Sequence, residues 1–168
     1  AAATLRALLT ASRPHLFENE LARVTTRSID ASAALGAALD GARALATPFD
    51  AANSLAQQLR MVAQIISARQ ATGARRQVFF VSLGGFDNHD NLLDIQPDLH
   101  ATLAGAIDSF HKATVELGVA ANVTTFTASD FGRTLTSNGD GSDHGWGAHH
   151  FVVGGAVRGG IYGHFPTV

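Results

Sequence analysis

The sequence contains no cysteine, a single lysine (Lys112) and few charged residues of either sign. The absence of cysteine excludes disulfide bonds and thiolate metal ligands. Charged residues make up only 15% of the chain and the net formal charge is -2, so the composition gives no electrostatic reason to expect a nucleic-acid partner. No apolar run reaches the roughly 18 residues that span a bilayer, and we therefore expect no membrane span.

Small and apolar residues are abundant: 46% of the 168 residues are hydrophobic. This composition favours one packed domain, or a large part of one, over disorder. The first residues lack the charged start and compact apolar core of a signal peptide. Because the chain does not begin with methionine, we expect it to work with a missing N-terminal part of the same, longer protein.

The chain divides into two segments of different character. Residues 1–74 are predicted to form a helical segment that packs on a sheet, with a break between helices at Arg13-Pro14. Thr47-Pro48 combines a capping residue with proline at the first helical position, which predicts a helix from there to Gly73. Residues 75–168 are predicted to be α/β, and they hold seven of the eight histidines.

The second segment has the pattern of a β-α-β unit. An apolar run at 78–83, a helix from Pro97 to Gly118 and a β-branched run at 122–127 predict two parallel strands joined by a helix. A second apolar run at 151–153 predicts another strand, and the tail after it a short edge strand or hairpin. The fold class is therefore predicted to be α/β, with a mostly parallel sheet.

Acidic residues and histidines follow the predicted strands and the glycine-rich turns. In open α/β sheets, ligands bind at the carboxyl ends of the strands, so these side chains are expected to meet at one edge. A mixed set of imidazoles and carboxylates suits zinc, manganese or iron better than calcium or magnesium. Such a set also suits a two-metal site for phosphoryl displacement. The candidate metal ligands are Asp87, His89, Asp130, Asp143 and His144.

Three further residues near these ligands have side chains that suit a site. Arg133 is the candidate substrate-binding residue, since its planar guanidinium can hold an oxygen of a small anionic ester. His149 and His150 are additional candidate ligands. In a strand they would point to opposite faces, so at most one of the two would face the site.

Each ligand pattern also has a structural explanation. Asp87 and His89 can form hydrogen bonds within a loop. Asp143 follows Gly141-Ser142 and can form an Asx turn. Asp130 can cap a short helix that begins at the next residue. The three clusters together, rather than any one of them, favour a site.

Residues 78–163 resemble the C-terminal part of the bacterial domain of unknown function 1501 family, whereas the helical first half matches it only loosely. The resemblance rests on four motifs, GGFDNH at 84–89, SDFGR at 129–133, SDHG at 142–145 and GGAVRGG at 154–160. The family is similar to the alkaline phosphatase and sulfatase superfamily of metal-dependent hydrolases. The resemblance therefore implies an alkaline phosphatase-like three-layer fold and a periplasmic or secreted protein, because full-length members typically have twin-arginine export signals.

The resemblance also implies roles for single residues. Asp87 and His89 match an Asp/His pair on one metal, Asp130 matches a ligand of the other, and His144 matches a late histidine that returns to the first. In an alternative register, Asp143 and His144 are the ligand pair of the superfamily's Asp-His-Gly motif.

Three departures from the family pattern bear on activity. Phe131 stands where sulfatases have a metal-binding histidine, and Asp130 stands where the family more often has glutamate. The nucleophile is missing, since neither Ser82 nor Ser129 lies in a context that would activate it. The sequence thus predicts part of a metal-dependent hydrolase of phosphate or sulfate esters, with zinc or manganese as the metal. The alternatives are a non-catalytic binding or assembly module with degraded metal sites, and an α/β domain whose polar loops are structural.

Overall fold

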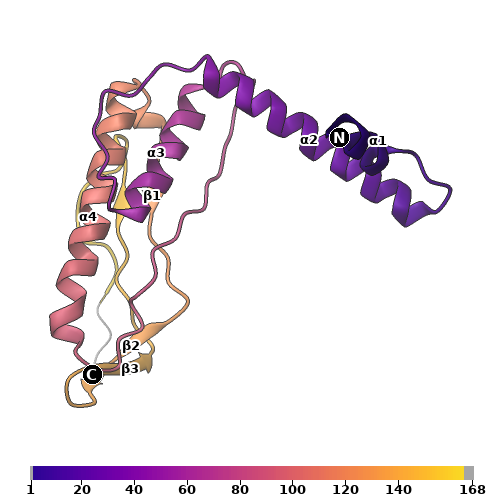
Figure 1. Ribbon diagram of the computed structural model, residues 1–168. Helices are drawn as coiled ribbons and strands as arrows, with labels where there is room; N and C mark the ends of the chain where they lie inside the picture. The colour runs from indigo at the N-terminus through magenta and orange to yellow at the C-terminus, as the bar shows by residue number, and fades with distance from the viewer. Residues whose placement is uncertain (1, 165–168) are drawn as a thin grey trace. The chain divides into compact units, whose positions relative to one another are not determined.

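The computed structural model describes residues 2–164 and contains mostly helix, with short strands towards its end (Figure 1). The helices are α1 (Ala2–Thr10), α2 (Leu16–Asp40), α3 (Ser54–Ser67), α4 (Leu92–Glu116) and the 3-10 helix η1 (Ala120–Asn122). The strands are β1 (Thr125–Phe126), β2 (Gly132–Ser137), β3 (Ser142–Gly145) and β4 (Val152–Val153). The described residues form two compact units: the first holds those up to 44 together with 64–77, the second holds 45–63 and those from 78 onward.

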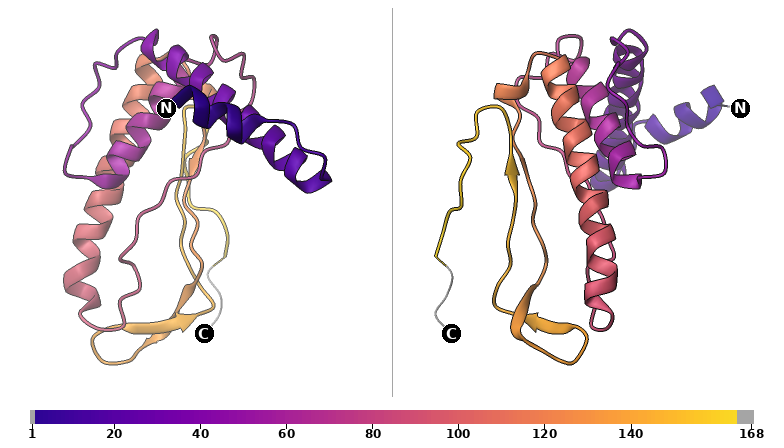
Figure 2. Two further views of the ribbon diagram at one scale, coloured as in Figure 1. Left: turned by 45° about the vertical axis from the view of Figure 1, so that its right-hand side comes forward. Right: turned by 90° about the vertical axis from the view of Figure 1, so that its left-hand side faces the viewer.

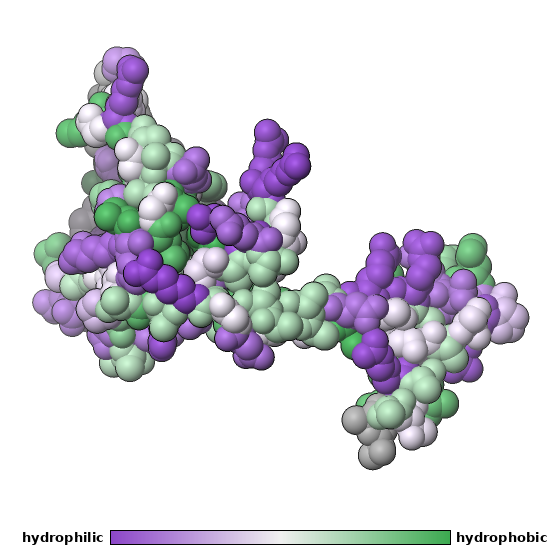
Figure 3. Space-filling view, turned by 90° about the horizontal axis from the view of Figure 1, so that it is seen from above, coloured by the Kyte–Doolittle hydropathy of each residue, from purple (hydrophilic) through white to green (hydrophobic). Residues whose placement is uncertain are grey.

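The first unit contains a helical hairpin of α1 and α2. The predicted break at Arg13-Pro14 is confirmed, because both residues lie in the loop between the two helices. An ion pair between Arg6 and Asp30, 2.6 Å long, joins one helix to the other. Large apolar side chains remain on the surface of this hairpin, and Figure 3 shows apolar and polar residues intermixed on the face that it presents. The most exposed of them are Leu16 and Phe17.

The core of the second unit lies where the first part of α3 runs alongside α4 (Figures 1 and 2). Apolar residues of α3 recur at helical spacing, and their side chains are buried. Phe110 is the largest buried side chain of α4. The buried residues of this core are Leu55, Ala56, Leu59, Val62, Ala63, Ala106, Phe110 and Ala113.

The predicted start of α3 at Thr47-Pro48 is wrong, because the helix begins at Ser54. Thr47 is instead bound to the end of α4, where its hydroxyl and its backbone N–H both donate to the Glu116 carboxylate, at 2.7 and 2.8 Å. Asn53 takes the capping role, and its Oδ1 accepts a hydrogen bond of 3.0 Å from the backbone N–H of Ala56.

The predicted start of α4 at Pro97 is also wrong, because the helix begins five residues earlier, at Leu92, and Pro97 lies inside it. The backbone carbonyl of Asp140 accepts the N–H of Leu92 at 3.0 Å, and the Asp140 carboxylate accepts the N–H of Asn91 at 3.3 Å. These bonds satisfy donors that a helix leaves free at its N-terminus. The predicted end is confirmed, since Gly118 follows the helix with a φ of +68°, a left-handed conformation that glycine adopts without strain.

Among residues 2–164, the strands pair antiparallel. β1 pairs with β4, in the register Thr125 with Val153. The run at 78–83 is not part of a strand ladder, although its residues alternate between half-buried and exposed. The Gln58 side-chain amide bonds both the N–H and the carbonyl of Ser82, at 3.1 and 2.9 Å, and so takes the place of a neighbouring strand there. No strand forms over 157–163 either. The parallel sheet and the three-layer arrangement therefore remain predictions.

The longest paired segment is the hairpin of β2 and β3. Arg133 lies opposite His144 in its ladder, and Gly132 lies opposite Gly145. The turn at 138–141 contains two glycines, Gly139 and Gly141. This hairpin lies at the same end of the unit as the N-terminus of α4 (Figure 2), and it positions two of the predicted ligands.

Candidate metal centre

The turn of the β2–β3 hairpin packs against the segment that carries the first pair of predicted ligands. The Asn138 side chain donates to the backbone carbonyl of His89 at 3.0 Å. Gly141 lies so close that a Cβ atom built on it would be 2.1 Å from the same carbonyl oxygen. Any larger residue would push the two segments apart, so glycine is required at this position. The hairpin therefore brings Asp143 and His144 next to a segment more than 50 residues earlier in the chain.

Three of the predicted ligands form one cluster. The Nε2 atom of His144 donates to Oδ1 of Asp87 at 2.8 Å, and the Nε2 atom of His89 lies 3.0 Å from the same oxygen. Each residue offers one ligand atom, and all three atoms lie within 4.8 Å of one another. The side chains are 45–60% exposed, so the cluster is open to solvent. One carboxylate and two imidazoles thus converge on a single point at the surface.

Asp143 contacts this cluster through the ring nitrogen of His89 that does not face Asp87. The Nδ1 atom of His89 donates to Oδ1 of Asp143 at 3.2 Å, and Asn138 donates to the same oxygen at 3.3 Å. The imidazole of His89 therefore has a carboxylate on each of its two nitrogens. A carboxylate that accepts the N–H of a metal-binding histidine fixes the orientation and tautomer of its ring. The position of Asp143 suits this orienting role.

The imidazoles also set the electrostatics of Asp87. The pKa of the Asp87 carboxyl lies below its ordinary value of 3.8, chiefly because His144 donates a hydrogen bond to it. Desolvation opposes this effect, whereas the charges that His144 and His89 can carry, and a hydrogen bond from His89, lower the pKa of Asp87 further. The pKa shift keeps Asp87 ionised, which is the state required of a metal ligand.

Phe131, directly before β2, contacts the cluster, and Arg133, within β2, contacts the segments that carry its ligands; the sequence indicated neither contact. The ring of Phe131 stacks on the imidazole of His144, with ring centroids 4.0 Å apart and planes at 15°. Arg133, the predicted anion-binding residue, uses both terminal nitrogens inside the protein, on the carbonyls of Phe86 and Ser142. The only signal in the sequence was the spacing of Phe131 and Arg133, which puts both side chains on one face of a strand.

The remaining candidate ligands lie outside this cluster. Asp130 is exposed, and it is not part of the group that Asp87, His89 and His144 form. The Nδ1 atom of His150 lies 3.3 Å from the hydroxyl of Thr127, across the β1–β4 ladder. Within residues 2–164 no second group of at least three potential metal ligands is found. The described side chains therefore form one candidate site, which could hold one ion.

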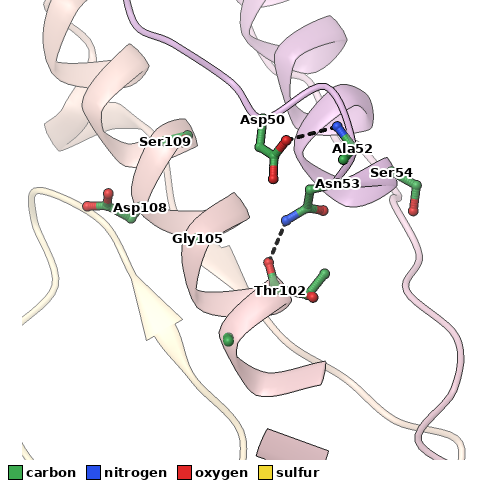
Figure 4. Close-up of a pocket in the computed structure, with 9 residues that line it drawn as sticks. Asp50, Ala52, Asn53, Ser54, Thr102, Gly105, Asp108 and Ser109 are labelled. Carbon is green, nitrogen blue, oxygen red and sulfur yellow. Dashed lines mark hydrogen bonds between the residues drawn. The ribbon is translucent and has the colours of Figure 1, made fainter. Parts of the chain in front are cut away.

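An open depression of about 650 Å³ lies elsewhere in the second unit, between α4 and the loop that leads into α3 (Figure 4). Asn53 bridges its two walls by donating to the carbonyl of Thr102 at 2.8 Å. Asp50 and Asp108 also line it. None of the residues of the Asp87 cluster lines this depression, so it does not form a substrate cavity around them.

Together, these features define a protein of helices and short antiparallel strands with an exposed carboxylate–imidazole cluster. Comparison with known families places it: residues 6–168 match the model of the DUF1501 family, described as "Protein of unknown function", and the chain belongs to that family. The match includes most of the helical first half, which the motifs alone linked only loosely to the family. No curated protein and no solved structure matches the chain significantly. Among the described residues, no helix has the length and apolar character to cross a bilayer.

Proposed function

We propose that Asp87, His89 and His144 bind one divalent metal ion, zinc or manganese, and that the protein is a metal-dependent hydrolase of phosphate or sulfate esters. The observation that carries this proposal is the convergence of three ligand atoms, contributed by two distant segments, within 4.8 Å. Membership of the DUF1501 family agrees with this reading but specifies neither metal nor reaction. The superfamily resemblance of the sequence motifs supports the choice of substrate.

The three side chains fit an ion of this kind. Ligands of a tetrahedral zinc ion lie about 2.0–2.1 Å from the metal, and hence about 3.3 Å from each other. The Nε2 atoms of His144 and His89 lie 2.8 and 3.0 Å from Asp87 Oδ1, and these hydrogen-bond lengths are only slightly shorter. Small side-chain movements would therefore accommodate the ion. Three protein ligands are also the number found at catalytic zinc sites, which keep the fourth position open for water or substrate.

The residues around the cluster would perform supporting tasks. An ion bound there would lower the pKa of a coordinated water and polarise an ester oxygen. Asp143 would keep Nδ1 of His89 protonated and Nε2 available as a ligand. Solvent exposure of the three ligands leaves room for a small anionic ester next to them. A periplasmic or secreted location is part of the same proposal.

The second candidate function is a non-catalytic binding or assembly module, and one observation favours it. Neither serine near the cluster is placed as an activated nucleophile. The Ser129 hydroxyl donates to the carbonyl of Phe131 at 2.8 Å, within a tight turn. The Ser142 hydroxyl lies 3.4 Å from the guanidinium of Arg133, which cannot act as a base. A hydrolase built on the residues described would therefore have to use water as its nucleophile.

Metal analysis tests the first part of the proposal. Chelator-treated protein is titrated with zinc and with manganese, and bound metal is measured after removal of free ions. We expect one ion per chain for the wild type and loss of that ion in Asp87→Ala and His144→Ala. His111→Ala is the matched control, because His111 lies on α4 outside the cluster. A wild-type protein that binds neither metal would refute the proposal.

Turnover of generic phosphate and sulfate esters then separates the two functions. A hydrolase shows metal-dependent turnover that disappears in Asp87→Ala and His144→Ala. Stoichiometric metal without turnover of either ester class, measured with the full-length protein, would identify the binding module instead.

A further inference from the structure

Arg133 connects the two segments that carry the metal ligands. One terminal nitrogen donates to the backbone carbonyl of Phe86 at 2.6 Å, directly before Asp87. The other donates to the backbone carbonyl of Ser142, directly before Asp143. A guanidinium is suited to such a task, since its rigid fork of donors can bond two acceptors at a fixed separation. The side chain is half-buried, and both terminal nitrogens have partners inside the protein.

The same side chain also lies over the ring that supports His144. The guanidinium carbon of Arg133 is 5.5 Å from the centroid of the Phe131 ring, within the range of a cation–π contact. Phe131 also stacks on the nearly parallel imidazole of His144, with ring centroids 4.0 Å apart. Phe131 therefore contacts both Arg133 and His144, and its stacking restricts how the His144 ring can rotate.

We propose that Arg133 is a positioning residue, which fixes the separation of the Asp87 and Asp143–His144 segments and, through Phe131, the plane of the His144 ring. This role differs from direct contact with a substrate anion. The prediction that Arg133 affects metal affinity rests on the proposed function. The prediction that Arg133 affects the geometry of the metal-free site does not depend on that function. In this chain Phe131 orients the ligand His144 and does not itself provide a ligand atom.

The first experiment uses the metal-free protein. Nuclear Overhauser effects between the rings of Phe131 and His144 report the stack directly. We expect them in the wild type and expect their loss in Arg133→Gln and in Arg133→Lys, because a lysine ammonium is a point charge that does not reproduce the fork. Arg6→Gln is the control, since Arg6 forms an ion pair on the helical hairpin of the first unit. Unchanged effects in both Arg133 variants would overturn the proposal.

The second experiment measures metal affinity without any anion present. Loss of a group that orients metal ligands typically lowers affinity about 10–100-fold. We expect this loss in Arg133→Gln, together with a changed cobalt absorption spectrum at saturating cobalt, which a merely less stable protein would not show. Wild-type metal affinity and an unchanged spectrum, with weakened binding of inorganic phosphate, would overturn the positioning role and indicate an anion contact. If the wild type binds no metal, the proposed function fails, and the ring contacts alone decide the role of Arg133.

Discussion

Removal of the Asp143 carboxylate should weaken metal binding without removing a ligand. Asp143→Ala deletes the acceptor that Nδ1 of His89 uses at 3.2 Å and leaves the three proposed ligand atoms in place. Without this acceptor, the ring of His89 can rotate, and either nitrogen can carry the proton. Only one of those states presents Nε2 as a ligand, so the metal must select a smaller population of the protein.

The structure sets the size of the effect. Loss of a carboxylate behind a metal-binding histidine typically costs 10–100-fold in affinity. The Asp143 side chain is 65% exposed and its hydrogen bond is long, so the lower end of that range applies. We expect an increase in the dissociation constant of about tenfold, or about 1.4 kcal/mol. Asp143→Asn keeps a neutral acceptor, and a smaller increase of about threefold is expected.

Competition titration against a chromophoric chelator measures these constants. Asp140→Ala is the matched control, because it removes a carboxylate from the same turn. The Asp140 carboxylate accepts the N–H of Asn91 at 3.3 Å and is not one of the groups that form the cluster. The metal affinity of this variant should equal that of the wild type. Equal losses in the Asp143 and Asp140 variants would show that only net charge or loop stability matters, and would refute the orienting role.

Two further predictions concern stability and pH. Phe110→Ala should destabilise the protein by about 3–5 kcal/mol in chemical denaturation, because its side chain is 4% exposed in the α3–α4 core, whereas Phe80→Ala, 93% exposed, should cost far less. Equal costs would contradict the described core. The Asp87 pKa is lowered in the folded protein, so the ionised carboxylate contributes stability above its ordinary pKa of 3.8, which is lost as pH falls through the folded value. The melting-temperature difference between wild type and Asp87→Asn should therefore be present at pH 6 and shrink as the pH falls below about 4. A difference that does not change with pH over this range would contradict a stabilising contribution from the ionised carboxylate.

The convergence of the cluster could be predicted from the sequence, although the sheet that was expected to produce it is not what positions the residues. Asp87 and His144 were expected to meet at the carboxyl ends of parallel strands. They do meet, at 2.8 Å, through an antiparallel hairpin whose turn packs against the backbone of His89. Glycine-rich turns next to acidic residues were therefore the informative pattern. The pairing of the strands depends on which segments lie side by side, and hydrophobic alternation does not encode this.

The helix starts could not be predicted from local caps alone, because distant residues bind the chain near both predicted starts. Thr47 has the local features of a cap, but the Glu116 carboxylate, 69 residues away in the chain, binds its N–H and hydroxyl. Pro97 has the local features of a first helical residue, but Asp140 satisfies the donors at 91 and 92 and extends the helix by one turn. Local propensity ranks the possible caps, whereas a tertiary hydrogen bond decides among them. Core positions along α3 depend on periodicity alone and were therefore predictable.

The contacts of Phe131 bear on how many ions the site can hold. In sulfatases, by the resemblance of the sequence motifs, a histidine at this position would offer a nitrogen for a second ion. Here an apolar ring occupies the face of His144, and Asp130, the other predicted ligand of a second ion, lies outside the cluster. Two-metal displacement needs two ions about 4 Å apart, each with its own ligands. The residues described bring together the ligands of one ion only. Metal analysis should therefore find one ion per chain, with the same stoichiometry in Asp130→Ala, and a second ion lost in that variant would show that Asp130 completes a site with residues beyond those described.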